Sequence, residues 1–436
     1  MTTAPPAYTG RRITREDGDR TAPHRDLAHR VFAISTAIGL LHALDDAVLN
    51  RQPGVPVTQH LPALLVVTAL AVTGVLLFGR LRTGLRAAMA LLFGGAALAN
   101  GALHVMHISV DGPSSSDITG VLAAAAGVVM LVMAAALPFL HRGERQVSAR
   151  RRWAVRGVAV VATAVMVFYI VMPIAVGIGQ THLFRDPIGA PPGGAYETVT
   201  FDSRDGLELS GWYSPSRNGA AVILVNSAGG DRLGSVQHAR MLADHGYGVL
   251  LYDARGAGRS EGSPNGYGWD WRHDVAGAID FLGTRTDVDP GRIGALGLST
   301  GADVLIEVGA EDKRLKAIVA DGATASSFSD IPPADRWANA YMAPVIATAA
   351  LLSGSTPPPR LAELAAQVSP TPLLLIAAGS IPMEIAMNRV YAEAAEEPVE
   401  LWELPDANHT AAIRDEAAAY EQRVIAHFDE ALLGPS

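Results

Sequence analysis

Long apolar stretches fill most of the first 180 residues, and polar positions interrupt them only at short links. Four stretches approach or exceed the roughly 18–20 residues that a helix needs to cross a bilayer: Leu61–Phe78, Leu85–Val105, Ile118–Leu140 and Ala154–Ile178. A fifth, Leu27–Leu49, is marginal because an aspartate pair lies near its end. The pattern predicts an all-α transmembrane bundle of about five helices over residues 27–180, after a disordered cytoplasmic tail at residues 1–26.

Arginine residues concentrate in alternate links between these stretches. Six lie in the N-terminal segment, the last of which, Arg30, falls just inside the first stretch; three lie in residues 80–86, and six lie in residues 142–156. The other two links, Asn50–His60 and Met106–Asp117, contain only Arg51. Because positive charge resists translocation, we expect a multi-pass cell-membrane protein whose N-terminus is cytoplasmic. Five crossings then place everything after about Gln180 outside the cytoplasm.

Histidine and aspartate residues gather near the predicted outer ends of two of the apolar stretches. His42 lies on the same helix face as Asp45 and Asp46, and His104 shares a face with His107. We interpret these residues as a hydrogen-bonded network between helices at the headgroup level, and we expect no metal and no other cofactor. The alternative is a zinc site, because two imidazoles and a carboxylate are suitable zinc ligands.

The pattern changes after a Pro/Gly-rich linker at residues 181–194, where short strand-like runs begin to alternate with amphipathic helical ones. The expected strands are Glu197–Phe201, Leu207–Tyr213, Ala221–Asn226, Gly248–Tyr252, Arg292–Leu298, Leu315–Ala320, Pro372–Ala377 and Val399–Leu404. The expected helices are Val236–His245, Trp271–Leu282, Ala302–Ala310, Glu384–Ala395 and Ala418–Leu433. This alternation predicts an α/β domain over residues 195–436, with a mostly parallel sheet covered by helices on both faces.

One motif in this half carries chemistry. The segment Gly297-Leu298-Ser299-Thr300-Gly301 joins an expected strand directly to an expected helix. Such a turn is so sharp that its flanking positions must be small, and it projects the serine hydroxyl above the sheet. Gly258-Arg259-Ser260-Glu261-Gly262 matches the same pattern, but no helix follows it. The context therefore selects Ser299 as the candidate nucleophile.

This motif, together with Asp253-Ala-Arg-Gly-Ala-Gly-Arg-Ser260 and Asn408-His409, resembles the α/β-hydrolase superfamily. A membrane-anchored, actinobacterial-like subgroup of bacterial members is the most similar. The resemblance covers about residues 195–436 and implies a serine hydrolase with a catalytic triad. It places the general base at His409, which follows the last expected strand, and assigns Asp253 and Arg255 a structural part.

The third member of the triad is open at this point. The superfamily usually carries an aspartate after the strand that ends near Ala378, but the loop here contains none. Glu384 is the carboxylate nearest to that place, and a glutamate orients an imidazole as an aspartate does. Asp321, just after the sixth strand, is the alternative acid. For the oxyanion hole we expect the backbone N–H of Thr300 and one from Ser227 or Ala228.

An insert at about residues 328–367 occupies the place of the superfamily's cap over the acyl pocket, and it is short and partly apolar. The implied activity is cleavage of an ester, thioester or amide through an acyl-enzyme, on a small-molecule or lipid-like acyl substrate. The alternative is a catalytically inactive, hydrolase-like sensor or binding domain that serves the membrane half. A net charge of −9 argues against nucleic acid as a partner, and the absence of cysteine excludes thiolate chemistry.

Overall fold

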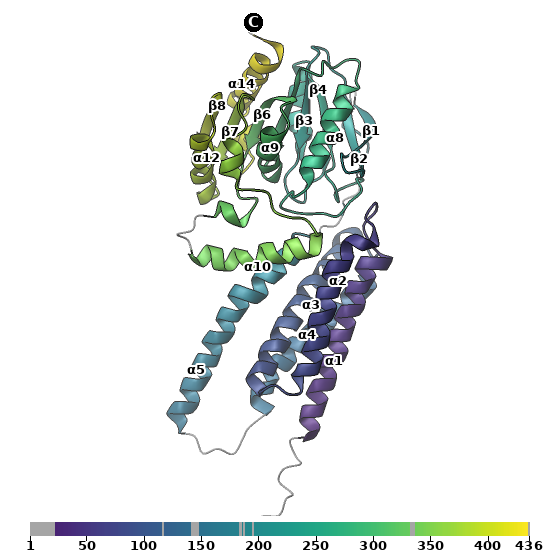
Figure 1. Ribbon diagram of the computed structural model, residues 1–436, viewed down its shortest axis with the longest axis vertical. Coiled ribbons are helices and arrows are strands. Elements are labelled where there is room, and N and C mark those ends of the chain that lie inside the picture. The colour runs from purple at the N-terminus through teal and green to yellow at the C-terminus, as the bar shows by residue number, and fades with distance from the viewer. Residues whose placement is uncertain are drawn as a thin grey trace, which may run out of the picture.

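The protein is described here from a computed structural model, which covers residues 22–115, 117–140, 148–182, 185, 188–193, 196–331 and 336–434. Most of the predicted tail, residues 1–21, lies outside these ranges. The first helix already begins at Ala22, before the predicted boundary at residue 27. The described chain forms a helical bundle with a separate α/β domain above one end (Figure 1).

The membrane half consists of helices that correspond to the predicted stretches. They are α1 (Ala22–Leu44) with the π-helical turn η2 (Asp45–Leu49), α2 (Val57–Phe78), α3 (Thr83–Asp111), α4 (Asp117–Leu140), and α5 (Ala149–Met166) continued by η3 (Val167–Val171) and α6 (Met172–Gly179). Five of these helical segments, the marginal first one included, are long and apolar enough to span a membrane. Many large apolar side chains are exposed on them, as lipid contact requires. The protein is therefore membrane-associated.

The C-terminal half contains one sheet of eight strands. The strands are β1 (Glu197–Asp202), β2 (Glu208–Ser214), β3 (Ala221–Val225), β4 (Gly248–Tyr252), β5 (Ile293–Leu298), β6 (Leu315–Asp321), β7 (Leu373–Ala378) and β8 (Val399–Leu404). Their spatial order is β1-β2-β4-β3-β5-β6-β7-β8, and β2 pairs antiparallel with both of its neighbours. From β4 to β8 all pairs are parallel. The predicted fold class is confirmed.

Helices cover both faces of this sheet, and each face has its own apolar core. The helices are α7 (Val236–Asp244), α8 (Trp271–Gly283), α9 (Thr300–Glu311), α11 (Leu361–Ala365), α12 (Pro382–Ala394), α13 (Ala412–Asp415), α14 (Ala417–Phe428) and the turn η6 (Asp429–Leu433). One core joins the sheet to α8, α9, α11 and α12. The other joins it to α7, α13 and α14. The β3 and β5 strands are buried on both faces, which is why their sequences are apolar throughout.

The insert after β6 forms a helix, α10 (Arg336–Ser353), that lies across the end of the bundle beneath the α/β domain (Figure 1). It packs closely on α6, because a Cβ atom at Gly177 would lie 2.6 Å from the backbone oxygen of Val345. Residues 332–335 of the predicted insert lie outside the described ranges. The predicted cap region therefore contacts the membrane half directly.

Backbone hydrogen bonds also connect the two halves. The N–H of Gly262 donates to the carbonyl oxygen of Pro53 at 2.8 Å, and that of Gly266 donates to Gln180 at 2.8 Å. Arg185 donates side-chain hydrogen bonds to the carbonyl oxygens of Ser260 and Gly262. The loop after β4 therefore rests on the end of the bundle.

Candidate active site

The parallel strands bring distant parts of the sequence to one edge of the sheet. The β3, β5, β7 and β8 strands run in the same direction, so their carboxyl ends meet at that edge. In open α/β sheets this edge is where ligands bind. The segments that follow these four strands contain the predicted oxyanion loop, Ser299, Glu384 and His409.

Ser299 occupies a strained turn between β5 and α9. Its φ of 52° and ψ of −117° are rarely adopted by a non-glycine residue. Added Cβ atoms at Gly297 and Gly301 would each lie 2.3 Å from a backbone oxygen, that of Gly301 and that of Val225. The backbone therefore accepts only glycine at these positions, which explains the two glycines of the motif.

The second match to the motif has no such geometry. The Ser260 side chain is fully buried, its hydroxyl donates to the carbonyl oxygen of Asp253 at 2.6 Å, and it accepts from the N–H of Ser210 at 2.9 Å. Asp253 in turn accepts two hydrogen bonds from the Arg232 guanidinium. These residues hold the loop after β4 in place, as the sequence interpretation proposed for Asp253.

His409 lies beside Ser299. Its Nε2 atom is 2.9 Å from the Ser299 Oγ atom, and the imidazole is about one quarter exposed. A Cβ atom at Gly322, where φ is +79°, would lie 2.9 Å from the His409 Cε1 atom. Glycine at this position therefore leaves the space that the imidazole occupies.

Glu384 completes a continuous chain of hydrogen bonds. Its Oε2 atom is 2.6 Å from His409 Nδ1, and its Oε1 atom accepts the N–H of Ala378 at 2.7 Å. The side chain is fully buried in the first turn of α12, where the helix dipole favours a negative charge. The hydrogen bond to this carboxylate raises the pKa of His409 above its ordinary value.

Asp321, the alternative acid, is also buried near the site, but its hydrogen-bond partner is different. Its Oδ2 atom accepts the Tyr420 hydroxyl at 3.1 Å, and no hydrogen bond joins it to His409 among the described residues. Burial raises the pKa of Asp321 to about 7, so its carboxyl group carries only part of a negative charge at neutral pH. Of the two candidates, the structure brings Glu384 to the imidazole.

The order of these elements along the chain is diagnostic. A serine in a strained strand-to-helix turn is followed by an acid after a later strand and a histidine after the last, on a mostly parallel eight-stranded sheet. The C-terminal domain has the α/β-hydrolase fold. Its helices α7 and α14 cover one face of the sheet and α8, α9 and α12 cover the other.

Comparison with known proteins finds one matching family and several similar proteins. Residues 197–399 match the family described as X-Pro dipeptidyl-peptidase (S15 family). The uncharacterized protein YfhR of Escherichia coli (strain K12) is 28% identical over 282 residues, which are 62% of this chain and 93% of that protein. The thiohydrolase apmlB of Arthrinium phaeospermum is 32% identical over 131 residues, 29% of this chain and 43% of that protein. The structure of the Pyrococcus furiosus esterase Pf2001 is 21% identical and covers 58% of this chain and 99% of its own, with a TM-score of 0.48.

The predicted oxyanion donors follow two adjacent parallel strands, Thr300 after β5 and Ser227 and Ala228 after β3. Thr300 is the first residue of α9, so its N–H is one of those that a helix leaves without an internal partner. The loop after β3 turns at Gly229, where φ is +67°, and the N–H of Gly230 donates to Ser227. Among the described residues, neither Thr300 nor Ala228 donates a backbone hydrogen bond, which leaves both N–H groups available.

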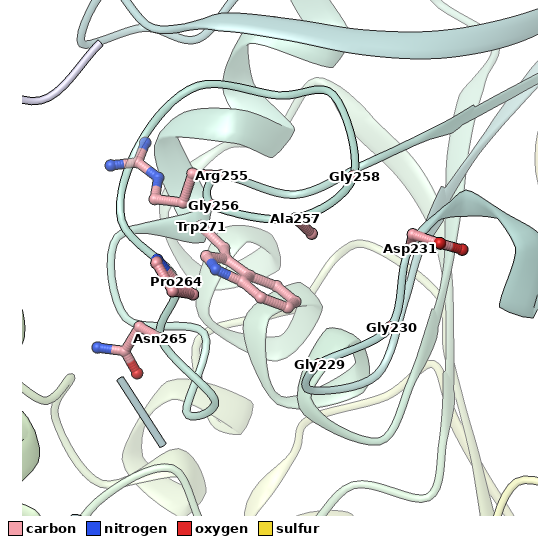
Figure 2. Close-up of a pocket in the computed structure, with 10 residues that line it drawn as sticks. All are labelled: Gly229, Gly230, Asp231, Arg255, Gly256, Ala257, Gly258, Pro264, Asn265 and Trp271. Atoms are coloured by element: carbon pink, nitrogen blue, oxygen red, sulfur yellow. The ribbon is translucent and has the colours of Figure 1, made fainter. Parts of the chain in front are cut away.

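A small pocket lies between this loop and the loop after β4, and Ser299 is not among the residues that line it (Figure 2). The Trp271 side chain lies between the Gly229–Gly230 turn and the loop that contains Gly256 and Gly258 (Figure 2). The volume of the pocket, about 10 Å³, is about that of one water molecule. The pocket is therefore too small for an acyl chain, and Ser299 itself is half-buried.

Two supporting residues escaped the sequence interpretation. The Ser380 hydroxyl accepts the backbone N–H of His409 at 2.8 Å. The Asn388 side chain donates to the carbonyl oxygens of Ala323 and Glu384, which ties α12 to the loop after β6. The sequence shows only that Asn388 lies one helical turn after Glu384. The other contacts, of Asn388 with Ala323 and of Ser380 with His409, join residues far apart along the chain.

Proposed function

We propose that this hydrolase cleaves an ester, thioester or amide bond through an acyl-enzyme, with Ser299 as nucleophile, His409 as general base and Glu384 as the acid of the triad. The observation that carries the proposal is the continuous hydrogen-bonded chain of these three side chains. His409 Nε2 takes the hydroxyl proton as Oγ attacks the carbonyl carbon, and it then gives this proton to the leaving group. Water repeats the two steps and releases the acid product.

Glu384 and the backbone donors have separate parts in this mechanism. The Glu384 carboxylate holds the proton on Nδ1, so that Nε2 presents its lone pair to the serine, and it stabilises the imidazolium that forms. The N–H groups of Thr300 and of Ala228 or Ser227 stabilise the negative charge on the tetrahedral intermediate. The mechanism uses neither a metal nor a cofactor.

Covalent labelling tests the nucleophile directly. A fluorophosphonate probe should label the full-length protein in detergent, because it reacts with activated serines, and Ser299→Ala should not be labelled. A matched control is Ser263→Ala, which changes another serine of the same domain. Labelling that persists in Ser299→Ala would disprove the assignment of the nucleophile. Absence of labelling in the wild type would favour the sensor alternative.

An apolar acyl chain is the substrate class that the surroundings of the site support. Helix α10 lies between the hydrolase domain and α6. Its Trp337 side chain is 74% exposed, and the ring centroids of Trp337 and Tyr169 are 6.0 Å apart. Tyr341 contacts Phe168 in the same group, with ring centroids 5.3 Å apart. Tryptophan and tyrosine are enriched where a membrane meets water. We infer that lipid-like esters reach the site along this surface.

A series of p-nitrophenyl esters checks this substrate class. We expect kcat/KM of the full-length protein in lipid nanodiscs to rise with acyl length, because each buried methylene contributes about 0.8 kcal/mol, or roughly fourfold. Ser299→Ala supplies the background rate for each ester. A rate that is constant or falls beyond the acetyl ester would contradict the lipid-like class.

We also propose that the hydrolase domain is extracytoplasmic. The arginine-poor links after η2 and after α3 lie at the end of the bundle nearest this domain, and the described arginine-rich segments, at the start of α1, between α2 and α3 and at the start of α5, lie at the opposite end (Figure 1). Because the chain contains no cysteine, single cysteines report the side of each segment. In intact cells a membrane-impermeant maleimide should label Gln422→Cys on α14 but not Arg82→Cys. The reverse result would place the hydrolase domain in the cytoplasm.

A further inference from the structure

A group of buried polar side chains lies at the end of the helical bundle that faces the hydrolase domain. His42 and Asp46 come from the end of the first helix and its turn η2, and His104 comes from α3. One nitrogen or oxygen atom of each lies within 4.8 Å of those of the other two. His42 is 1% exposed and His104 is 5% exposed. Ionisable groups buried among apolar helices are costly and usually functional.

The hydrogen bonds around His42 fix which of its nitrogens carries the proton. The Thr119 hydroxyl donates its single proton to Asp45 Oδ2, at 2.6 Å. The 3.1 Å contact between Thr119 Oγ1 and His42 Nδ1 therefore needs the proton on the imidazole. The Nε2 atom of neutral His42 then carries a lone pair. Among the described residues this atom has no hydrogen-bond partner.

His104 has the same arrangement on α3. The Asp117 carboxylate accepts the N–H and the hydroxyl of Ser114, each at 2.7 Å, and the Nδ1 atoms of His104 and His107, each at 3.1 Å. Since a carboxylate only accepts, both imidazoles carry their proton on Nδ1. This tautomer makes Nε2 the imine nitrogen of His104, which is the atom that would bind a metal ion. His107, which the sequence grouped with the possible ligands, instead supports Asp117.

A fourth side chain joins the group from the segment after α6. The Nδ1 atom of His182 is 3.0 Å from the carbonyl oxygen of Ile178, so it carries the proton there too. Its Nε2 atom is 4.0 Å from Asp46 Oδ2, and His42 Nε2 is 3.4 Å from the same oxygen. The Asp46 oxygen is buried and also lacks a hydrogen-bond partner among the described residues. The lone pairs of His42 Nε2 and His182 Nε2 therefore lie near the same Asp46 oxygen, an arrangement that a shared proton or a cation stabilises.

We propose that His42, Asp46, His104 and His182 bind one divalent transition-metal ion, with zinc as the class that fits best. Three imidazole nitrogens and one carboxylate oxygen match the tetrahedral preference of zinc. Each imidazole is held through its Nδ1–H by a hydroxyl, carboxylate or carbonyl oxygen, which is the outer-shell pattern of zinc-binding histidines. The distances between the candidate ligand atoms are longer than the roughly 3.3 Å that Zn–N bonds of about 2.0 Å impose on neighbouring ligands. Metal binding therefore draws the side chains inward.

The position of this site indicates a structural part for the metal. The ligands come from the end of α1, from its turn η2, from α3 and from the segment after α6. Three residues beyond His182, the Arg185 side chain donates to carbonyl oxygens in the loop that leads from β4 toward the active site. The metal therefore holds together the segments at the boundary between the membrane half and the hydrolase domain. Its removal should lower the thermal unfolding midpoint.

Metal analysis of the full-length protein in detergent tests the proposal. After expression with added zinc, we expect about one zinc ion per chain, and chelation followed by cobalt(II) should give the visible absorption of a tetrahedral site. His104→Ala and Asp46→Asn should lower the zinc content by more than about tenfold. His29→Ala is the matched control, because this histidine lies on α1 thirteen residues before His42, where its Nε2 atom is 3.0 Å from the carbonyl oxygen of Val75. Ser299→Ala should bind metal like the wild type, which separates this site from the hydrolase chemistry.

Two results would overturn the proposal. One is a wild-type protein that contains no zinc after expression with the metal and shows no tetrahedral cobalt spectrum, which would leave a hydrogen-bonded network held by protons. The other is an unchanged zinc content in both ligand variants. Should these variants fail to fold, the chelation and cobalt titration of the wild type decide the question alone.

Discussion

Replacing His409 by alanine should lower kcat by about 10⁶-fold, because the serine hydroxyl then has no base to take its proton. The His409 imidazole lies within hydrogen-bond distance of Ser299 Oγ, at 2.9 Å. The leaving group also needs the proton that this imidazole carries after the attack. Steady-state hydrolysis of an activated ester by the full-length protein measures the effect. Labelling by the fluorophosphonate probe should slow in parallel.

His245→Ala is the matched control for this variant. Its imidazole lies on the surface of the same domain, where it pairs with Glu421 at 2.8 Å, and its loss should leave kcat unchanged. Thermal unfolding midpoints of both variants should stay close to that of the wild type, because both imidazoles are partly exposed. A loss of kcat below about tenfold in His409→Ala would remove this residue from the role of base.

Glu384→Gln should lower kcat by about 10⁴-fold through the wrong tautomer of His409. The N–H of Ala378 needs an acceptor at the Oε1 position, so the amide oxygen of the glutamine stays there and its NH₂ group faces His409. The imidazole then accepts at Nδ1 and carries its proton on Nε2, where it cannot receive the proton of Ser299. Measured kcat of the purified variant checks this.

The pH profile gives an independent signature of the same contact. The base must be unprotonated, so kcat/KM rises with pH through the pKa of His409, which Glu384 holds above the ordinary value of 6.5. In Glu384→Gln this stabilisation of the imidazolium is lost, and the acidic limb of the profile should move to lower pH. Asp321→Asn should change kcat far less, since Asp321 is bonded by Tyr420. A loss of about 10⁴-fold in Asp321→Asn, with an active Glu384→Gln, would reverse the assignment of the acid.

Local patterns in the sequence were enough to predict most elements of this protein, although not the helices α10, α11 and α13. A helix that crosses a bilayer must satisfy its own backbone groups and present apolar side chains for about 20 residues. Such a helix can therefore be recognised from consecutive positions in the sequence. The buried parallel strands leave similar runs, and the nucleophile turn needs glycine at both flanks. The eight strands, the five apolar helices and the candidate nucleophile are all features of this kind.

The acid of the triad was decided only by the tertiary structure. Glu384 and Asp321 both follow strands that end at the same edge of the sheet, and both are buried. Their carboxylates differ in hydrogen-bond partners. Ala378 and His409 bind the carboxylate of Glu384, whereas Tyr420 binds that of Asp321. These partners come from separate parts of the chain, so no local pattern records them.

The same holds for the cap and for the buried histidines. The sequence placed an apolar insert after the sixth strand, but its packing on α6 depends on the close approach that Gly177 allows. It also placed His42 and His104 at one depth, yet His182 joins them only because α6 ends beside η2. The sequence determined which segments form and what chemistry they contain, because these depend on neighbouring residues. The tertiary structure decided which side chains meet, because contact depends on the packing of segments far apart in the chain.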